Sequence, residues 1–366
     1  MEKYGSKEMI IFAQSVTGAS HTMKGIVCQD SSGSRMPRED VHIAVVADGH
    51  GDPTCFRSDR GSGMAVSAAL ECLEKFAEHY EDMKAIQEEM DPVYGDEYIR
   101  RQLTDAIVSG WSAMVRTDIA ANRLTDDELD RSGDFKDIYL KGRHVERIYG
   151  STLVAALKAK DYMVLIQQGD GRCDIMSMDG SVDQPVPKDD RCHGNVTTSM
   201  SDEIAADEIR SIILPLEEDV TGCCLSTDGV ENSFYEDEKI LEFLVETGLK
   251  LTAETSENHS RVLVPALEEV TEKGNGDDVS LAGWFDPDKL NESAGSIRDR
   301  LKARRREDEI AQLEKKLAVM EQKDRQLREQ VRSASPEQMP GYMKEYMDYR
   351  KKFNRLRAAV EELKSE

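Results

Sequence analysis

Long hydrophobic runs are absent from this sequence of 366 residues. No stretch approaches the ~20 consecutive apolar residues that a membrane-spanning helix needs, so we expect no membrane partner. Cysteine is also scarce: there are 7, an odd number, and their spacing contains no paired zinc-binding motif. Free thiols of this kind are typical of reducing compartments, so we expect a cytoplasmic protein.

Basic residues are in short supply over most of the chain. There are 48 Lys and Arg residues against 72 Asp and Glu, a net charge of -24. Residues 296–366 hold 19 basic and 14 acidic residues, which leaves 29 and 58 for residues 1–295. A body this acidic repels nucleic acid, and we expect no nucleic-acid partner. The basic stretch KARRRE at 302–307 is followed by acids and is interpreted as a solvated helix face.

Short apolar runs typical of strands recur through the first 285 residues. They are MIIFAQSV (9–16), VHIAVVA (41–47), STLVAALKA (151–159), YMVLIQQ (162–168), CDIMSM (173–178), TGCCLST (221–227) and VSLAGWF (279–285). Two short turns, at 160–161 and 169–172, separate the third, fourth and fifth runs. This spacing predicts antiparallel hairpins at both turns.

Helical periodicity fills the long intervals between these runs. It covers residues 61–80 and 99–121, and further helices are expected near 238–248 and 258–272. Strand clusters separated by long helices, without strict alternation, predict an α+β fold with antiparallel sheets and helices packed outside.

Composition changes at residues 286–296, where DPDKLNESAGS combines Pro, Gly, Asn and Ser. This segment predicts a break between a domain of residues 1–290 and a C-terminal segment of residues 296–366. Beyond it, residues recur at spacings of three and four over 310–331 and again over 342–363, and nearly all of them are apolar. The pattern predicts a coiled-coil hairpin that associates with itself or with a partner. An alternative interpretation packs both helices onto the first domain.

Aspartates lie at the edges of five strand-like segments, most of them beside glycine. They are Asp30 in CQDS, Asp48 in VVADGHGD, Asp170 in QQGDGR, Asp228 in STDGV, and Asp277 with Asp278 in GDDVSL. Each motif alone could be an ordinary acidic turn. Buried side by side, however, such carboxylates repel one another and need a cation to neutralise them. Oxygen ligands select hard ions such as Mg²⁺ or Mn²⁺ over zinc, so the repetition predicts a metal centre.

In their order along the chain, these motifs resemble those of the metal-dependent protein phosphatases, the type 2C or PPM family. The matching motifs are CQDS (28–31), VVADGHGD (45–52), GSTLVAAL (150–157), GDGR (169–172), STDGV (226–230) and GDDVSLAGW (276–284). The resemblance implies a four-layer αββα sandwich, with two antiparallel sheets face to face and flanked by helices. It also implies hydrolysis of phosphoserine and phosphothreonine in proteins by a water that bridges two divalent cations.

The resemblance also assigns roles by position. The implied ligands of Mn²⁺ or Mg²⁺ are Asp48 as the bridge between both ions, the carbonyl of Gly49, Asp228, Asp277 and, for a weaker third ion, Asp170. Asp30 would hold a metal-bound water. The choice between Asp277 and its neighbour Asp278 stays open.

Three positions depart from the family pattern. Gly25 stands where members usually have an arginine that grips the phosphate, so we expect Lys24 or His21 to bind the substrate. Gln29 replaces a frequent glutamate and Asn232 a frequent aspartate, which removes two carboxylates. These departures support an alternative interpretation: a pseudophosphatase that acts as a partner-binding scaffold through its coiled coil.

Three other features near the motifs have competing interpretations. His50, beside the bridging aspartate, is a candidate general acid for the leaving serine oxygen, or a residue that supports the site. Ser151 and Thr152 lack a Ser/His/Asp arrangement and are expected to open a buried strand. Arg172 is interpreted as a structural partner of acidic neighbours.

Overall fold

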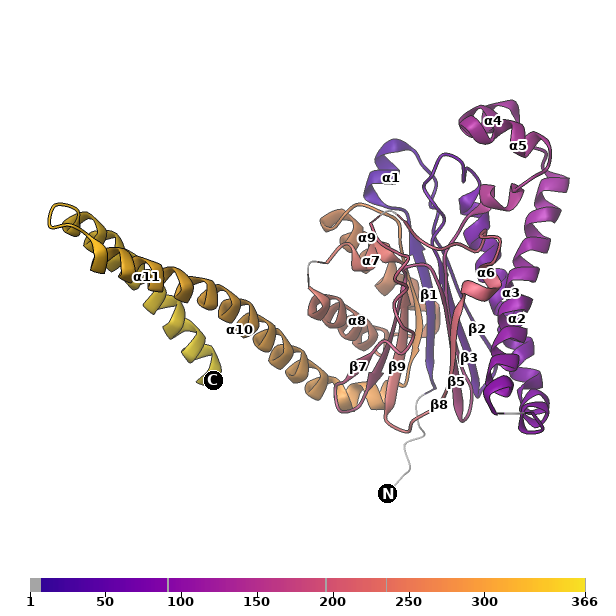
Figure 1. Ribbon diagram of the computed structural model, residues 1–366. Coiled ribbons are helices and arrows are strands. Elements are labelled where there is room, and N and C mark those ends of the chain that lie inside the picture. Colours follow the sequence, from indigo (N-terminus) through magenta and orange to yellow (C-terminus); the bar gives the residue numbers. More distant parts are fainter. Residues whose placement is uncertain (1–7, 91, 195, 235, 366) are drawn as a thin grey trace, which may run out of the picture. The chain divides into compact units, whose positions relative to one another are not determined.

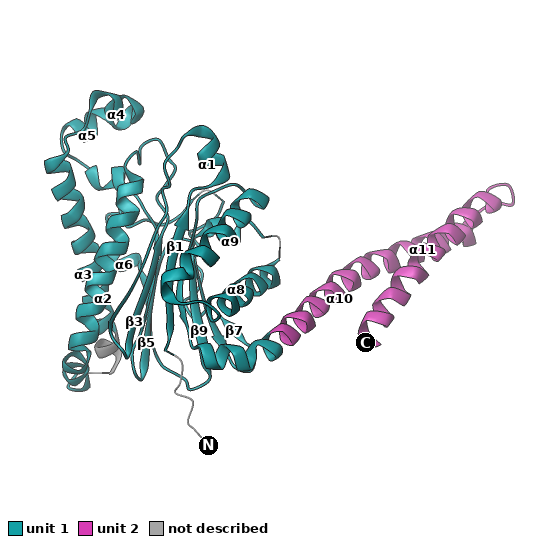
Figure 2. Cartoon of the chain, turned by 180° about the vertical axis from the view of Figure 1, so that it is seen from behind, with its two compact units in different colours: residues 1–297 teal, residues 298–366 magenta. Residues whose placement is uncertain are grey.

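The computed structural model describes residues 8–90, 92–194, 196–234 and 236–365. The chain divides into two compact units, Met1–Ile297 and Arg298–Glu366 (Figure 2). Among the described residues, no helix combines the length and the apolar character required to cross a bilayer.

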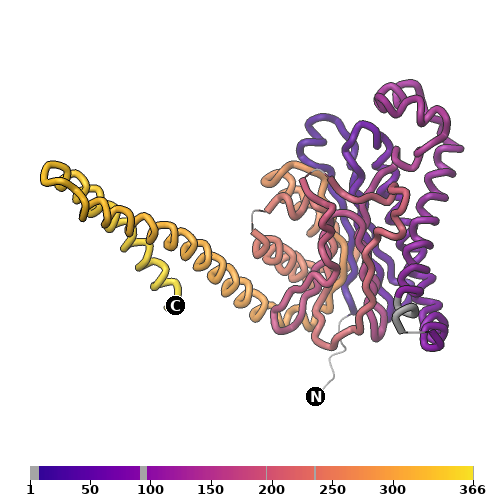
Figure 3. Tube along the Cα trace, viewed as in Figure 1, coloured from indigo at the N-terminus to yellow at the C-terminus, as the bar shows by residue number. Residues whose placement is uncertain are grey.

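The described part of the first unit contains two five-stranded sheets, in which all neighbouring strands are antiparallel (Figure 1). One has the order β1 (Ile10–Val16), β10 (Val279–Phe285), β9 (Val220–Ser226), β6 (Arg172–Ser177), β7 (Val182–Asp183). The other has the order β2 (Ser31–Arg38), β3 (Val41–Ala47), β4 (Leu153–Lys158), β5 (Tyr162–Gln168), β8 (Arg210–Pro215). The trace in Figure 3 shows β1 (indigo) beside β10 (orange), although they lie far apart in the sequence.

All the expected strand-like runs form strands, and β3, β5, β9 and β10 are buried along their whole length. The sequence did not predict β2, β7 and β8. All three are at sheet edges and at most partly buried, so they lack the continuous apolar run of a central strand.

The turn between β4 and β5 is a hairpin, as predicted. The hairpin prediction at residues 169–172 is wrong, because β5 and β6 belong to different sheets. The chain crosses between the sheets at Gly169, whose φ is +87°. A Cβ there would lie 2.6 Å from Thr152 Cγ2, so only glycine fits this crossing. Both flanking runs are buried, and burial alone does not tell which sheet a strand joins.

Helices cover the outer faces of both sheets, which gives the expected four layers (Figure 1). The long helices are α2 (Ser58–Glu88) and α3 (Pro92–Ala121) on the β2–β8 sheet, and α8 (Asp237–Leu251) and α9 (His259–Lys273) on the β1–β7 sheet. Short helices lie in the connections: α1 (Ala19–Lys24), α4 (Asp126–Arg131), α5 (Lys136–Leu140), α6 (Ala205–Glu208) and α7 (Asp228–Glu231), with 3₁₀ turns at Gly133–Phe135, Val145–Tyr149 and Ser256–Asn258.

Successive residues of β3 enter different hydrophobic layers. Ile43 and Val45 pack toward α2 and α3, whereas Ala44 and Val46 pack between the two sheets with Trp284. This alternation follows from the period of two along a strand. The strand β3 is therefore packed between two hydrophobic cores, and the loop that follows it begins at a rigid strand.

The segment 286–296, expected to separate the two parts of the chain, is almost entirely helical, because α10 (Pro287–Ser333) begins there; the two units divide just beyond it, between Ile297 and Arg298. Asp286 Oδ1 accepts hydrogen bonds from the amides of Asp288 and Lys289, both at 3.1 Å, as a helix N-cap does. Proline suits the first helical position, so the Asp-Pro pair starts a helix. The first turns belong to the first unit, in which Leu290 and Ile297 are fully buried.

The second unit is a helical hairpin made of the rest of α10 and α11 (Met339–Ser365). Leu327, Phe353 and Val360 are buried between the two helices. The Tyr349 hydroxyl donates to the carbonyl of Met320 at 3.0 Å and ties the helices together.

Candidate metal centre

Asp30 and Asp48 leave the same end of the β2–β8 sheet, the end at which α1 lies (top of Figure 1). Ser31, the first residue of β2, pairs with Ala47, the last residue of β3. Because the strands are antiparallel, Asp30 directly precedes and Asp48 directly follows this pair. Strand register alone therefore brings the two carboxylates together.

The other sheet brings Asp228 and Asp277 to the corresponding end. Ser226 at the end of β9 pairs with Leu281 near the start of β10. Asp228 lies two residues beyond the end of β9, and Asp277 lies two residues before the start of β10. Asp170 joins them from the crossing between the sheets.

Asp48 lies between two other carboxyl groups. The charges of Asp30 and Asp228 both act on its carboxyl group. Burial raises the pKa of Asp48 well above its usual range, and the charges of Asp30, Asp228 and Asp277 raise it further. Neighbouring carboxylates repel one another, so a bound cation would favour their ionised forms.

Asp30 and Asp228 have raised pKa values for the same reason. Burial is the largest cause in both, bringing the pKa of Asp30 to about 8 and that of Asp228 to about 7. The hydroxyl of Thr227 donates to Asp30 Oδ2 at 2.7 Å and opposes the shift. Burial thus disfavours the charged form of both groups, which a bound cation would favour.

The two adjacent aspartates before β10 have different surroundings. The amides of Gly18 and Gln29 donate to the two carboxylate oxygens of Asp278, each at 2.6 Å. The side chain of Asp277 is 49% exposed, and its charge acts on Asp48 and Asp228. Asp278 therefore braces the loops and its charge acts on Asp30, whereas the charge of Asp277 acts on Asp48 and Asp228.

Gly49 is held where no side chain fits. A Cβ there would lie 2.6 Å from the carbonyl oxygens of both Gln29 and Ser58. The amide of Gly49 donates to the Gln29 carbonyl at 3.1 Å, and Gln29 Nε2 donates to Ser58 Oγ at 2.7 Å. Gln29 thus holds the turn after Asp48 with its backbone carbonyl, and its side-chain amide holds the start of α2.

His50 is packed against the backbone on the other side of this turn. Its amide donates to the Gly150 carbonyl at 3.0 Å, and a Cβ on Gly150 would meet the His50 ring at 2.6 Å. Burial lowers the pKa of His50, and the charges of Asp170 and Asp202 partly offset that effect. The imidazole is therefore largely neutral at pH 7.

The two expected phosphate-binding residues have different environments. His21 Nδ1 lies 3.0 Å from Asp278 Oδ1, and His21 Nε2 lies 3.9 Å from Asp277 Oδ1. Lys24 is exposed at the end of α1. Gly25 has a φ of +67° with open space around its Cα, so it ends the helix.

Amide and hydroxyl groups hold the two remaining carboxylates. Asn232 Nδ2 donates to Asp228 Oδ2 at 2.9 Å, and Thr197 Oγ1 donates to Asp170 Oδ1 at 3.0 Å. Asp170 and Asp228 line the same cavity of about 220 Å³. The asparagine that departs from the family pattern is thus a hydrogen-bond donor to a candidate ligand.

The donor set fits hard divalent cations. It consists of carboxylate oxygens with a backbone carbonyl nearby, the ligands that Mg²⁺ and Mn²⁺ prefer. Across the described residues, no three of the acidic, histidine or cysteine side chains surround a common point closely enough to form a complete cage. The carboxyl groups act on one another through their charges, and a cation would offset this repulsion.

Sequence reasoning missed the residues that orient the carboxylates. Thr152 and Thr227 are both buried: Thr227 donates to the Asp30 carboxylate, and Thr152 Oγ1 accepts from the backbone amide of Asp48. The signal for both was present in GSTL and STDG, where a threonine flanks a buried strand. The interpretation of Arg172 is confirmed: it pairs with Asp174 at 2.6 Å and Asp237 at 2.5 Å.

Comparison with known proteins gives one family. The family model for Protein phosphatase 2C matches residues 17–268, more than half of the chain. No curated protein sequence matches this chain significantly.

Several solved structures have similar folds. Serine/threonine phosphatase Stp1 from Staphylococcus aureus is 14% identical with a TM-score of 0.43, over 78% of this chain and 98% of that one. The catalytic domain of serine threonine protein phosphatase PstP, in complex with 2 manganese ions, is 16% identical with a TM-score of 0.43, over 76% and 97%. A C. elegans sex determining protein is 16% identical with a TM-score of 0.44, over 78% and 67%. Likeness at this level does not identify a function.

Proposed function

The chain belongs to the protein phosphatase 2C family, and we propose on this basis that it is a metal-dependent hydrolase of phosphoserine and phosphothreonine in proteins. One observation carries the proposal: strand register brings the acidic residues to the ends of the two sheets, where the charges of Asp30, Asp228 and Asp277 all act on the Asp48 carboxyl group. Carboxyl groups gathered in this way repel one another and are unfavourable in a fold that needs no cation.

We assign the ligands from this cluster. Two Mn²⁺ or Mg²⁺ ions would be held by Asp48 between them, the Gly49 carbonyl, Asp228 and Asp277, with Asp170 available to a third ion. Asp277 is preferred to Asp278 because two backbone amides already occupy the oxygens of Asp278.

Bound cations would lower the pKa of the attacking water and neutralise charge on the phosphate oxygens. Asp30, held by Thr227, would orient that water. His50 would donate a proton to the leaving oxygen, and the negative charge of a bound phosphate would favour its protonated form. Lys24 would contact the phosphate, while His21 supports the acidic pair Asp277 and Asp278.

Hydrolysis of p-nitrophenyl phosphate and of a phosphothreonine peptide, with Mn²⁺ and with EDTA, tests the proposal. We expect turnover that requires the cation. Absence of turnover at every Mn²⁺ and Mg²⁺ concentration would contradict it.

The alternative is a pseudophosphatase that acts as a partner-binding scaffold. It is favoured by the two amides, Gln29 and Asn232, that stand near the carboxylates and cannot neutralise a cation. It predicts a protein that binds Mn²⁺ weakly and turns over neither substrate.

We also propose that the first unit is the catalytic domain and that the hairpin of residues 298–366 mediates association as a coiled coil. Met339, Met343 and Met347 follow one another at spacings of four and are 36%, 40% and 58% exposed. They form an apolar stripe on α11, and methionine-rich faces suit contact with another protein.

All seven cysteines are free, which supports a cytoplasmic location.

A further inference from the structure

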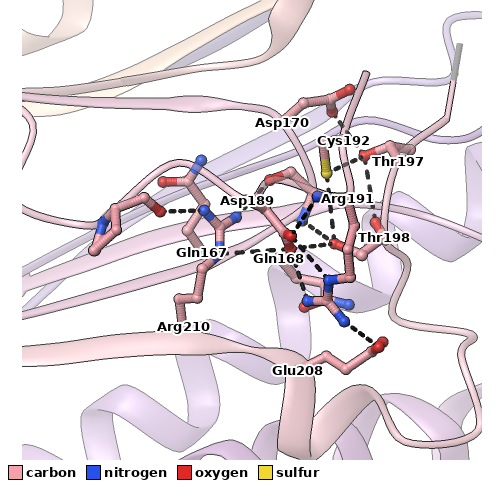
Figure 4. Close-up of polar contacts among 12 residues, drawn as sticks. Gln167, Gln168, Asp170, Asp189, Arg191, Cys192, Thr197, Thr198, Glu208 and Arg210 are labelled. Carbon is pink, nitrogen blue, oxygen red and sulfur yellow. Dashed lines mark hydrogen bonds and ion pairs between the residues drawn. The ribbon is translucent and has the colours of Figure 1, made fainter. Parts of the chain in front are cut away.

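The loop of residues 187–199, in which residue 195 is outside the described residues, is tied to the crossing between the two sheets (Figure 4). It follows β7 and precedes α6. Its contacts converge on Gly169 and Asp170, the last of which belongs to the candidate metal centre. The family assignment gave this loop no role.

Gly169 is held through both of its backbone groups. Its amide donates to Thr198 Oγ1 at 3.0 Å, and its carbonyl accepts from a guanidinium nitrogen of Arg210 at 2.6 Å. Arg210 also donates to the carbonyl of Pro187 at the start of the loop. One guanidinium group thus joins the loop to the crossing.

A buried carboxylate completes the attachment. Asp189, whose side chain is 5% exposed, accepts a hydrogen bond from Thr198 Oγ1 at 3.3 Å. It also pairs with Arg191 at 2.8 Å and lies 3.8 Å from Arg210 Nε. The threonine that receives the Gly169 amide is therefore itself fixed by an ion pair.

The residue before Thr198 in the loop reaches Asp170. Thr197 Oγ1 donates to Asp170 Oδ1 at 3.0 Å (Figure 4). Asp170 shares a cavity of about 220 Å³ with Asp228, and its charge acts on both Asp228 and His50. A hydroxyl that donates to one carboxylate oxygen fixes the rotation of the group and leaves the other oxygen free to bind a cation.

We propose that Thr197 and Arg210 are positioning residues that aim the Asp170 carboxylate at the metal centre and thereby set the affinity for a cation on that side. Arg210 fixes the peptide before Asp170, and Thr197 fixes its side chain. The inference rests on the proposed function, because it concerns cations at the same site.

Mn²⁺ binding to the full-length protein, followed by electron paramagnetic resonance or calorimetry, tests the role of Thr197 without reference to turnover. Thr197→Val removes the hydroxyl at nearly constant volume, and Thr197→Ser keeps it. We expect Thr197→Val to weaken the weakest Mn²⁺ site about 10- to 100-fold, as loss of a ligand's hydrogen-bond partner does elsewhere. We expect Thr197→Ser to stay near wild type.

Thr117→Val is the matched control, because the Thr117 hydroxyl donates to Ala113 within α3. Arg210→Lys keeps the charge but loses the fork that joins Pro187 to Gly169, and should also weaken the site. If Thr197→Val fails to fold, Mn²⁺ binding to Arg210→Lys tests the inference instead. Wild-type binding in whichever variant folds would overturn the inference. A wild-type protein that binds no Mn²⁺ and hydrolyses nothing would overturn the proposed function instead.

Discussion

Asp48 and Thr152 are joined by two hydrogen bonds. The amide of Asp48 donates to Thr152 Oγ1 at 3.0 Å, and the amide of Thr152 donates to the Asp48 carbonyl at 2.8 Å. Asp48 directly follows β3 and Thr152 directly precedes β4, so the pair extends the contact between the two strands by one residue on each. These two hydrogen bonds therefore fix the direction in which Asp48 leaves the sheet.

Thr152→Val should destabilise the fold and impair the metal centre together. The substitution leaves the Asp48 amide without its acceptor in a site where Thr152 is 2% exposed. We expect a loss of about 1–3 kcal/mol in the free energy of unfolding, measured in urea. We also expect weaker Mn²⁺ activation of hydrolysis. Thr152→Ser keeps the acceptor and should preserve that activation; an equal loss in the serine variant would show that the methyl group matters instead.

Lys24→Ala and His21→Ala should differ in kinetics. Lys24 is exposed, and a contact made equally to bound substrate and transition state affects KM more than kcat. His21 touches Asp278 at 3.0 Å, so its loss should instead raise the Mn²⁺ concentration needed for half-maximal activity. Steady-state kinetics at several Mn²⁺ concentrations separate the two effects. Unchanged kinetics in the double variant would exclude both residues.

Acid should destabilise the protein through His42. This side chain is 1% exposed, and neither of its ring nitrogens has a hydrogen-bond partner. Burial and then the charge of Lys158 lower its pKa from 6.5 to about 4. The unfolded chain therefore binds a proton that the folded chain does not between pH 6.5 and 4, and stability falls as pH falls through this window.

Replacement of His42 by phenylalanine should remove that part of the pH dependence. The wild-type free energy of unfolding should fall more steeply between pH 6.5 and 4 than that of His42→Phe, by at most about 1.4 kcal/mol per pH unit. His79→Gln is the control, because the side chain of His79 is 66% exposed. Parallel pH profiles for wild type and His42→Phe would contradict the assignment.

Removal of the hairpin should leave catalysis intact and reduce the size of the particle. A cut must fall beyond Ile297, since Leu290 and Ile297 are fully buried in the first unit. We expect a protein of residues 1–303 to keep Mn²⁺-dependent hydrolysis and to form a smaller species in light scattering. A full-length protein that is already monomeric, or a folded but inactive truncation, would count against the proposed division of roles.

The sequence predicted the central strands and the convergence of the acidic residues. Asp48 and Asp228 each follow a long apolar run, and a carboxylate just beyond a buried strand must lie at a sheet end. It did not predict the crossing at Gly169, because burial does not reveal which sheet a strand joins. It also did not predict that the Asp-Pro pair at Asp286 starts a helix that runs through the expected boundary.

The roles of Arg210 and Thr197 could not be predicted because they depend on contacts distant in the chain. Arg210 reaches Gly169 across 41 positions of sequence, and Thr197 reaches Asp170 across 27.

Arg57 is a buried arginine that pairs with Glu128 at 2.7 Å and donates to Tyr149 at 2.9 Å. Nothing in the local sequence around Arg57 marks it as a buried residue.

Calorimetric titration of Mn²⁺ into the wild-type protein and into Asp48→Asn and Asp228→Asn, combined with hydrolysis of p-nitrophenyl phosphate, tests the metal centre most directly. Asparagine keeps the shape of each side chain and removes the charge that a cation needs. Asp52→Asn is the control, because Asp52 lies in the same turn and accepts hydrogen bonds from Thr54. We expect both site variants to lose Mn²⁺ binding and nearly all hydrolysis while Asp52→Asn keeps both. More than about a tenth of the wild-type rate in a site variant, a loss below about 1.4 kcal/mol in transition-state stabilisation, would contradict the assignment.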